Sequence, residues 1–163
     1  MRESLAAVYP RRDAMDLHRL DHMPSVKVAM TTFPHAVEVA APLSRAREMM
    51  LEHDIHHLPV TEAGDLVGVI SAREVALGTS ISSARDPRRE PSVGEACVRH
   101  AYVVEDAERL DRVLARMAAD RVGCALVVRR GKLVGIFTVT DACRLLAEWL
   151  RTRFPEPDGG EAA

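Results

Sequence analysis

The chain has 163 residues, of which 47% are hydrophobic and 28% are charged, and its formal net charge at pH 7 is −2. This composition is that of an ordinary globular protein with an apolar core. Because basic and acidic residues are mixed and nearly equal in number, no long-range field favours nucleic acid or anionic lipid. We therefore expect neither nucleic acid nor a membrane as a partner.

The start of the chain and its cysteines indicate a cytoplasmic protein. Residues 1–5 carry charges where a signal peptide requires apolar residues, and no run reaches the ~18 apolar residues of a membrane span. The three cysteines are odd in number, widely spaced and set in apolar surroundings, which favours reduced core thiols: Cys97, Cys124 and Cys143. We expect a soluble, cytoplasmic protein.

Residues 1–22 are polar and predict an N-terminal arm lying on the rest of the protein. Val37 and Val39 then alternate with polar neighbours, as in a short strand, until Pro42 ends the pattern. The following apolar residues recur at helical spacing and predict a helix with one buried stripe: Leu43, Ala46, Met49, Met50 and His53.

A hairpin and a second helix follow in the same unit. Residues 58–60 and 66–70 are apolar and flank a polar turn, which predicts two antiparallel strands. Ser71, with Glu74 three residues later, has the capping-box pattern of a helix start, and Gly78 is typical of a helix end. Residues 79–92 are rich in Ser, Arg and Pro and predict a linker.

The chain then repeats itself at an offset of 67 positions. The second copy predicts a strand at 103–104, a helix from 110, a hairpin within 125–137 and a last helix from Thr138 to about 154, before a disordered tail at 155–163. Matching apolar residues and glycines carry the register: Val26 with Val93, Val37 with Val104, Leu43 with Leu110, Val60 with Val127, and Gly64 with Gly131. The fold class we expect is α+β, with two two-layer β-α-β-β-α units.

The end of each repeat carries the polar residues that could bind a ligand. The second ends in Gly135-Ile136-Phe137-Thr138-Val139-Thr140-Asp141, which places a hydroxyl and a carboxylate on the first turn of a helix. A helix N-terminus favours a phosphate, and a carboxylate one turn later can accept both hydroxyls of a ribose. The same spacing is also an ordinary capping box that binds nothing.

The doubled unit and its Gly-apolar-x-Thr-x-x-Asp ending resemble the cystathionine-beta-synthase (CBS) domain pair over roughly residues 23–150. Paired central strands such as Ile55-His56-His57-Leu58-Pro59-Val60 are similar to that family. The resemblance implies two units, 23–78 and 93–154, packed about a pseudo-twofold axis. It also implies two clefts that bind adenine nucleotides or other adenosyl ligands, and assembly into flat homodimers. Members of the family usually sense rather than catalyse.

Carried over residue by residue, the resemblance assigns six residues to each cleft. The main cleft would use Thr138 on a phosphate, Asp141 on the ribose, and Ala29, Met30, Ile55 and His56. The second would use Ser71, Glu74, Ala96, Cys97, Val122 and Gly123. Glu74 stands where the family has aspartate, which makes the second cleft the weaker prediction. Ala125 stands where some relatives have a basic phosphate ligand, so AMP or ADP is expected over ATP.

The expected function is a stand-alone, non-enzymatic regulatory module that binds an adenine nucleotide and signals to an unknown protein in trans. No catalytic cofactor is expected. Two alternatives are a structural or oligomerisation module with empty clefts, and a sensor of S-adenosylmethionine or NAD.

His53, His56 and His57 lie close together in the sequence, and the fold could bring His35 near them, so that they could hold a metal. Helix-dipole pairing and phosphate contact explain these histidines without a metal, and no metal site is predicted.

Overall fold

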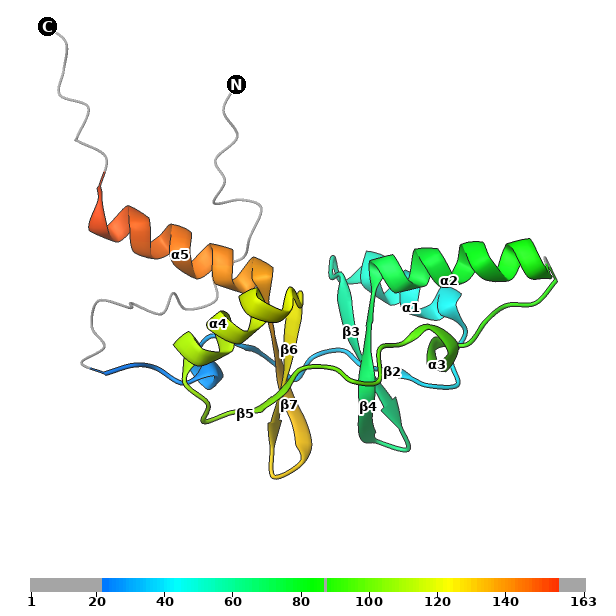
Figure 1. The fold of residues 1–163 in the computed structure, drawn as a ribbon, viewed down its shortest axis with the longest axis horizontal. Coiled ribbons are helices and arrows are strands. Elements are labelled where there is room, and N and C mark those ends of the chain that lie inside the picture. The colour runs from blue at the N-terminus through cyan, green and yellow to red at the C-terminus, as the bar shows by residue number, and fades with distance from the viewer. Residues whose placement is uncertain (1–21, 87, 156–163) are drawn as a thin grey trace, which may run out of the picture.

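The computed structural model describes residues 22–86 and 88–155, and it consists of two halves that lie side by side (Figure 1). The predicted arm (1–22) and tail (155–163) lie almost entirely outside the described residues. In both halves the long helices lie on one side of the molecule and the hairpin turns point to the other (Figure 1). The α+β fold class and the doubled unit are therefore confirmed.

The first half contains a three-stranded sheet in the order β2-β3-β4, in which β2 is parallel and β4 antiparallel to β3. Leu43, Ala46, Met49 and Met50 form the buried stripe of α1, as their helical spacing predicted. Leu58 and Ile70 from the hairpin are fully buried beneath it. The elements of this half are β2 (Val37–Glu38), α1 (Leu43–Glu52), β3 (His57–Glu62), β4 (Asp65–Ser71) and α2 (Ala72–Arg85).

The second half repeats this order and adds one strand. Its sheet has the order β1-β7-β6-β5, with β5 parallel and β7 antiparallel to β6. Phe137 of β7 is fully buried in its core. The elements are β5 (Val103–Glu105), α4 (Leu110–Asp120), β6 (Cys124–Arg129), β7 (Lys132–Thr138) and α5 (Val139–Arg153), while the added strand is β1 (Thr31–Thr32).

The predicted end of the second helix at Gly78 is wrong, because α2 continues to Arg85. Residues 79–85 of the predicted linker are therefore helical. Gly78 has a packing role: a Cβ there would lie 2.8 Å from Cδ1 of Leu43 and 3.2 Å from Cβ of Ala96. The missing side chain lets α2 lie close to its neighbours, so this glycine does not end the helix.

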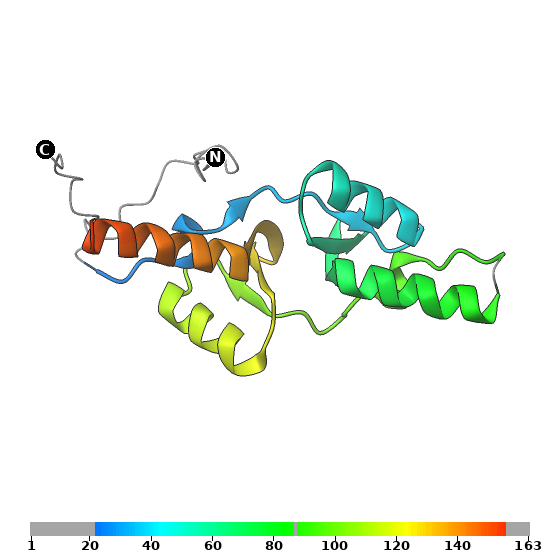
Figure 2. The same ribbon diagram turned by 90° about the horizontal axis from the view of Figure 1, so that it is seen from above.

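The two halves exchange their leading segments. The 3-10 helix η3 (Val26–Val28) and strand β1 precede the first half in sequence, yet Val26 belongs to the core of the second. Conversely, Val93 of the short helix α3 (Val93–Ala96) belongs to the core of the first half. The connections between the halves are seen from above in Figure 2. Because each core is completed by chain from the other half, neither half buries its apolar surface alone.

Two glycines at equivalent positions admit the exchanged segments. A Cβ on Gly68 would lie 2.6 Å from the carbonyl oxygen of Val98, and one on Gly135 would lie 3.0 Å from the carbonyl oxygen of Thr31. The backbones therefore approach at distances that a side chain would prevent. These glycines begin the sequence motif that precedes each helix.

The contacts obey the pseudo-twofold symmetry that the repeat implies. Val26 N donates to Glu108 O and Val93 N donates to Ala41 O, each over 2.8 Å, and these pairs differ by the repeat offset. Lys132 Nζ lies 2.7 Å from Oδ1 of Asp65, a residue 67 positions earlier. This ion pair therefore joins equivalent turns across the axis.

No helix in the described residues is long and apolar enough to cross a bilayer.

Candidate functional site

The end of β7 and the start of α5 form a closed network around one buried carboxylate. Oδ2 of Asp141 accepts hydrogen bonds from the Thr138 amide (2.9 Å) and hydroxyl (2.7 Å), while the Asp141 amide donates to the Thr138 hydroxyl over 3.2 Å. Asp141 is only 6% exposed. Burying a carboxylate is costly without such partners, and its place in the first helical turn lets the helix dipole stabilise it further.

Arg144 occupies the other oxygen of this carboxylate. Its Nη2 donates to Oδ1 of Asp141 from one turn further along α5, and the two side chains form an ion pair. The side chain of Arg144 is 35% exposed and that of Asp141 is 8% exposed. The pair thus extends from a buried carboxylate to a guanidinium at the surface.

The equivalent junction in the first half is also a capping box. Oε2 of Glu74 accepts from the amide of Ser71 (3.0 Å) and from its hydroxyl, and Ser71 is the N-cap of α2. Both junctions therefore satisfy their own helix amides. They differ at the second carboxylate oxygen: in the described part of the chain, Oε1 of Glu74 accepts no hydrogen bond.

The structure brings Ala29 and Met30 to the half that contains Asp141. Both are buried in the second core together with Phe137, and the side chain of Met30 packs against the position where Gly135 lacks a Cβ. These two residues thus flank the strand that leads to Thr138. Their direct contact with a ligand stays a prediction.

Ile55 and His56 lie in the first half, between α1 and β3. The carbonyl of His56 accepts from the Ala72 amide over 3.0 Å, and the equivalent carbonyl of Gly123 accepts from Val139 over 3.0 Å. Ile55 and His56 also line a cavity of about 470 Å³ beside Val75. Their participation in the Asp141 cleft stays a prediction.

The residues predicted for the second cleft come from both halves. Ala96 and Cys97 pack against the first core, and Val122 packs against the second. His57 approaches Gly123 so closely that a Cβ on the glycine would lie 2.8 Å from its Nε2. The first half therefore contacts the second at Gly123, one of the residues predicted for this cleft.

Electrostatic effects also link groups of the two halves near Gly123. Burial first, and then the charge of Glu74, raise the pKa of the Cys124 thiol to about 11. Burial lowers the pKa of His57, Glu74 opposes this effect, and His56 adds to it. Glu74 thus acts electrostatically on one group of each half, so it lies near the interface between them.

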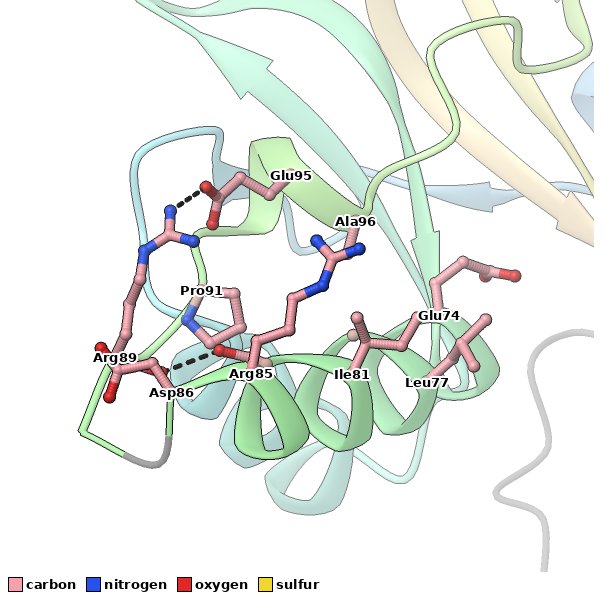
Figure 3. A pocket seen from close by; sticks show the side chains of 11 residues that line it. Glu74, Leu77, Ile81, Arg85, Asp86, Arg89, Pro91, Glu95 and Ala96 are labelled. Carbon is pink, nitrogen blue, oxygen red and sulfur yellow. Dashed lines mark hydrogen bonds and ion pairs between the residues drawn. The ribbon is translucent and has the colours of Figure 1, made fainter.

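A groove of about 360 Å³ runs between α2 and the segment that contains α3 (Figure 3). Leu77 and Ile81 of α2 line it, and the ion pair of Arg89 with Glu95 lies at one end. Glu74 stands at the opposite end with its carboxylate directed away from the groove (Figure 3). The groove therefore does not supply the Glu74 carboxylate with a partner.

The histidines considered for metal binding are arranged in other ways. The rings of His35 and His53 stack, with centroids 3.7 Å apart and planes 5° from parallel. Among the described residues, no three His, Cys, Asp or Glu side chains are grouped so that they could hold a metal ion. The stacked pair instead joins the connection between β1 and β2 to the end of α1.

Comparison with known proteins decides the family. The chain matches the CBS domain over residues 25–77 and again over residues 93–148. The chain belongs to the CBS domain family. The CBS domain-containing protein YhcV of Bacillus subtilis strain 168 is 31% identical over 123 residues, which are 73% of this chain and 83% of YhcV.

Another relative of this CBS pair is much longer. An L-aspartate semialdehyde sulfurtransferase of Methanocaldococcus jannaschii is 27% identical over 105 residues. The matched part is 63% of this chain but 19% of that enzyme. The CBS pair therefore corresponds to about a fifth of the enzyme's length.

Solved structures share the fold of this CBS pair. An acetoin utilization protein (AcuB) of Vibrio cholerae has a TM-score of 0.71 at 28% identity and covers 83% of this chain and 100% of its own. The CBS domain pair of protein MJ0100, solved with 5′-methylthioadenosine and S-adenosyl-L-methionine, has a TM-score of 0.68 at 23% identity. CBSX2, solved with AMP, has a TM-score of 0.67 at 24% identity. Each of the last two covers 78% of this chain and 99% of its own.

Two residues at the junctions of the CBS pair were not among the sequence predictions for the clefts. Arg144 is one helical turn after Asp141, and an i, i+3 ion pair is a signal that the sequence contains. His57 was grouped with possible metal ligands, although the repeat places it at the position of Cys124. Only the packing of the halves shows that His57 contacts Gly123.

The raised pKa of Cys124 leads to a test of the packing between the halves. The thiolate is the reactive form, and at about pH 8 a thiol with this pKa is ionised in about one molecule in a thousand. Cys143 is exposed, so the prediction that it is a core thiol is wrong. We expect iodoacetamide to modify Cys143 while Cys124 stays protected until urea unfolds the protein. Peptide mass spectrometry measures both rates. Equal rates in the folded protein would contradict the described interface.

Proposed function

We propose that this CBS pair is a regulatory module that binds an adenine nucleotide at the Asp141 junction and signals to a partner protein in trans. The observation that supports this most is the buried Asp141 at the N-terminus of α5, next to a hydroxyl and to segments of both repeats. Relatives of the same fold, solved with AMP or with 5′-methylthioadenosine and S-adenosyl-L-methionine, support it further.

The junction offers each part of a nucleotide a matching group. The α5 N-terminus and the Thr138 hydroxyl suit a phosphate. Oδ2 of Asp141 accepts the hydrogen bonds of the helix cap, so Oδ1 is the oxygen that would accept the ribose hydroxyls. Arg144, which donates to Oδ1, would then either keep this hydrogen bond beside the ribose or give it up. Ala125 is fully buried in the core and adds no charge, which is why AMP or ADP is proposed over ATP.

We further propose that the module forms a flat homodimer through its helices. Apolar side chains remain exposed on α2 and on α5: Leu77 (56%), Ile81 (45%), Leu146 (56%), Trp149 (36%) and Leu150 (41%). Burial of such surface drives association, and closed twofold dimers are the commonest homo-oligomers. The regulated protein would then respond to a change in how the two halves pack. The size of that change depends on how much more tightly the ligand binds one arrangement of the halves than the other.

Calorimetric titration of the purified protein with AMP, ADP, ATP and S-adenosylmethionine tests the proposed function. We expect saturable heat with AMP or ADP, and a ligand at about 100 times its dissociation constant should stabilise the fold by about 2.7 kcal/mol in a thermal shift. No heat and no shift with every compound would contradict nucleotide binding.

That negative outcome would favour a second candidate, a structural module. Both junctions already form complete capping boxes within the protein, and this arrangement stabilises α2 and α5 without a ligand. In that case the acidic residues would serve only as caps. The exposed apolar helix faces would then be the functional surface, and analytical ultracentrifugation would show a ligand-independent dimer.

A further inference from the structure

The two junctions share the capping box but differ in charge at the residue three positions after the acid. Arg144 follows Asp141 in α5, whereas Leu77 follows Glu74 in α2. Arg144 forms an ion pair with its acid, but Leu77 is 56% exposed and has no charge to offer. Among the described residues, the same position therefore supplies an ion-pair partner to the carboxylate in one half and none in the other.

The hydrogen bonds show the same difference. Both oxygens of Asp141 accept, one from Thr138 and one from Arg144. In Glu74 only Oε2 accepts from described residues, namely from Ser71. Burial raises the pKa of Cys124, and the charge of Glu74 raises it further. Burial lowers the pKa of His57, and the charge of Glu74 opposes that effect. The Glu74 carboxylate thus has no ion-pair partner among the described residues, whereas the Asp141 carboxylate is paired with Arg144.

Resting on the proposed function, we propose that this position sorts adenosyl ligands by charge between the two clefts. The Asp141 cleft takes phosphorylated ligands, because a guanidinium has five N–H donors and can bind the carboxylate and a phosphate together. The Glu74 cleft takes ligands whose tail is neutral or cationic, because a phosphate there would meet a carboxylate that no described residue pairs. Arg144 and Leu77 occupy the position that sets this preference, and Arg144 does so by contacting the phosphate.

The test compares AMP with adenosine, which differ only in the phosphate, by calorimetric titration of single variants. In Arg144→Leu we expect the affinity for AMP to fall about tenfold, while that for adenosine stays the same or rises. In Leu77→Arg we expect a further AMP site per chain to appear. Arg144→Lys should keep the preference for AMP, because the positive charge remains.

Arg151→Leu is the matched control, since Arg151 lies exposed on the same helix and donates to the Ala147 carbonyl over 3.2 Å. It should leave both affinities unchanged. If Arg144→Leu and Leu77→Arg bind both compounds with the wild-type ratio of affinities, the inference is overturned while the proposed function stands. If neither compound binds to the wild type, both are overturned. Thermal unfolding of each variant confirms that the comparison is made on folded protein.

Discussion

Phe137→Ala is expected to lower the free energy of unfolding by about 3 to 5 kcal/mol. Phe137 is fully buried in β7, one residue before Thr138, and its core cluster includes Val26, Ala29 and Met30 from the exchanged leading segment. Removing its ring leaves a cavity where the two repeats share one core. Urea unfolding followed by circular dichroism measures the change.

The control for this prediction is the same substitution at an exposed position. Phe33 is 89% exposed, so Phe33→Ala should change the free energy of unfolding by less than about 0.5 kcal/mol. If the two variants are equally stable, Phe137 does not hold the second core together. The exchange of segments would then contribute less to stability than its burial indicates.

Asp141→Asn is expected to weaken AMP binding roughly tenfold to a hundredfold, because each hydrogen bond to a charged group contributes about 1.5 to 3 kcal/mol. Asparagine has nearly the same shape and keeps one oxygen, so the Thr138 cap is preserved in part. The loss of charge also frees Arg144 from its ion pair. Calorimetric titration of the wild type and the variant with AMP measures the effect.

Asp111→Asn is the matched control for this substitution. Asp111 is also an acidic residue in the first turn of a helix of the second half, but it pairs with Arg109 at the surface. It should bind AMP as the wild type does. If both variants bind AMP with the wild-type affinity, Asp141 is only a helix cap.

Much of the fold could be predicted from the repeated pattern. The stripe on α1 has helical spacing, and the hairpin turns contain Gly64 and Gly131, so the order of elements within each half follows from local sequence. The offset of 67 positions then predicts that one half repeats the other. Local patterns of this kind are read reliably because they depend on residues close in the chain.

The parts that were missed depend on contacts between distant residues. The sequence predicts a helix end at Gly78, yet the missing side chain of this glycine makes room for Leu43 and Ala96, which are far from it in sequence. The pairing of β1 with β7 joins Thr31 to Ile136, and no local periodicity marks a two-residue strand. Tertiary packing therefore overrides local propensity at both places.

The candidate site was predictable in composition but not in its charge balance. The Thr138 and Asp141 spacing, and the presence of Glu74 where the family has aspartate, could be read from the motif. The approach of His57 to Gly123 could not, because it requires the halves to be packed. The position of Arg144 is visible in the sequence, but only the folded structure shows that it donates to Oδ1 of Asp141.

A crystal structure of the protein with AMP tests the central claim most directly. We expect ribose hydroxyls within hydrogen-bonding distance of Oδ1 of Asp141 and the phosphate at the N-terminus of α5 near Thr138. We also expect Arg144 to contact both the phosphate and the Asp141 carboxylate. The contradicting result is AMP bound elsewhere or absent at saturating concentration, while Asp141 still accepts only from Thr138 and Arg144.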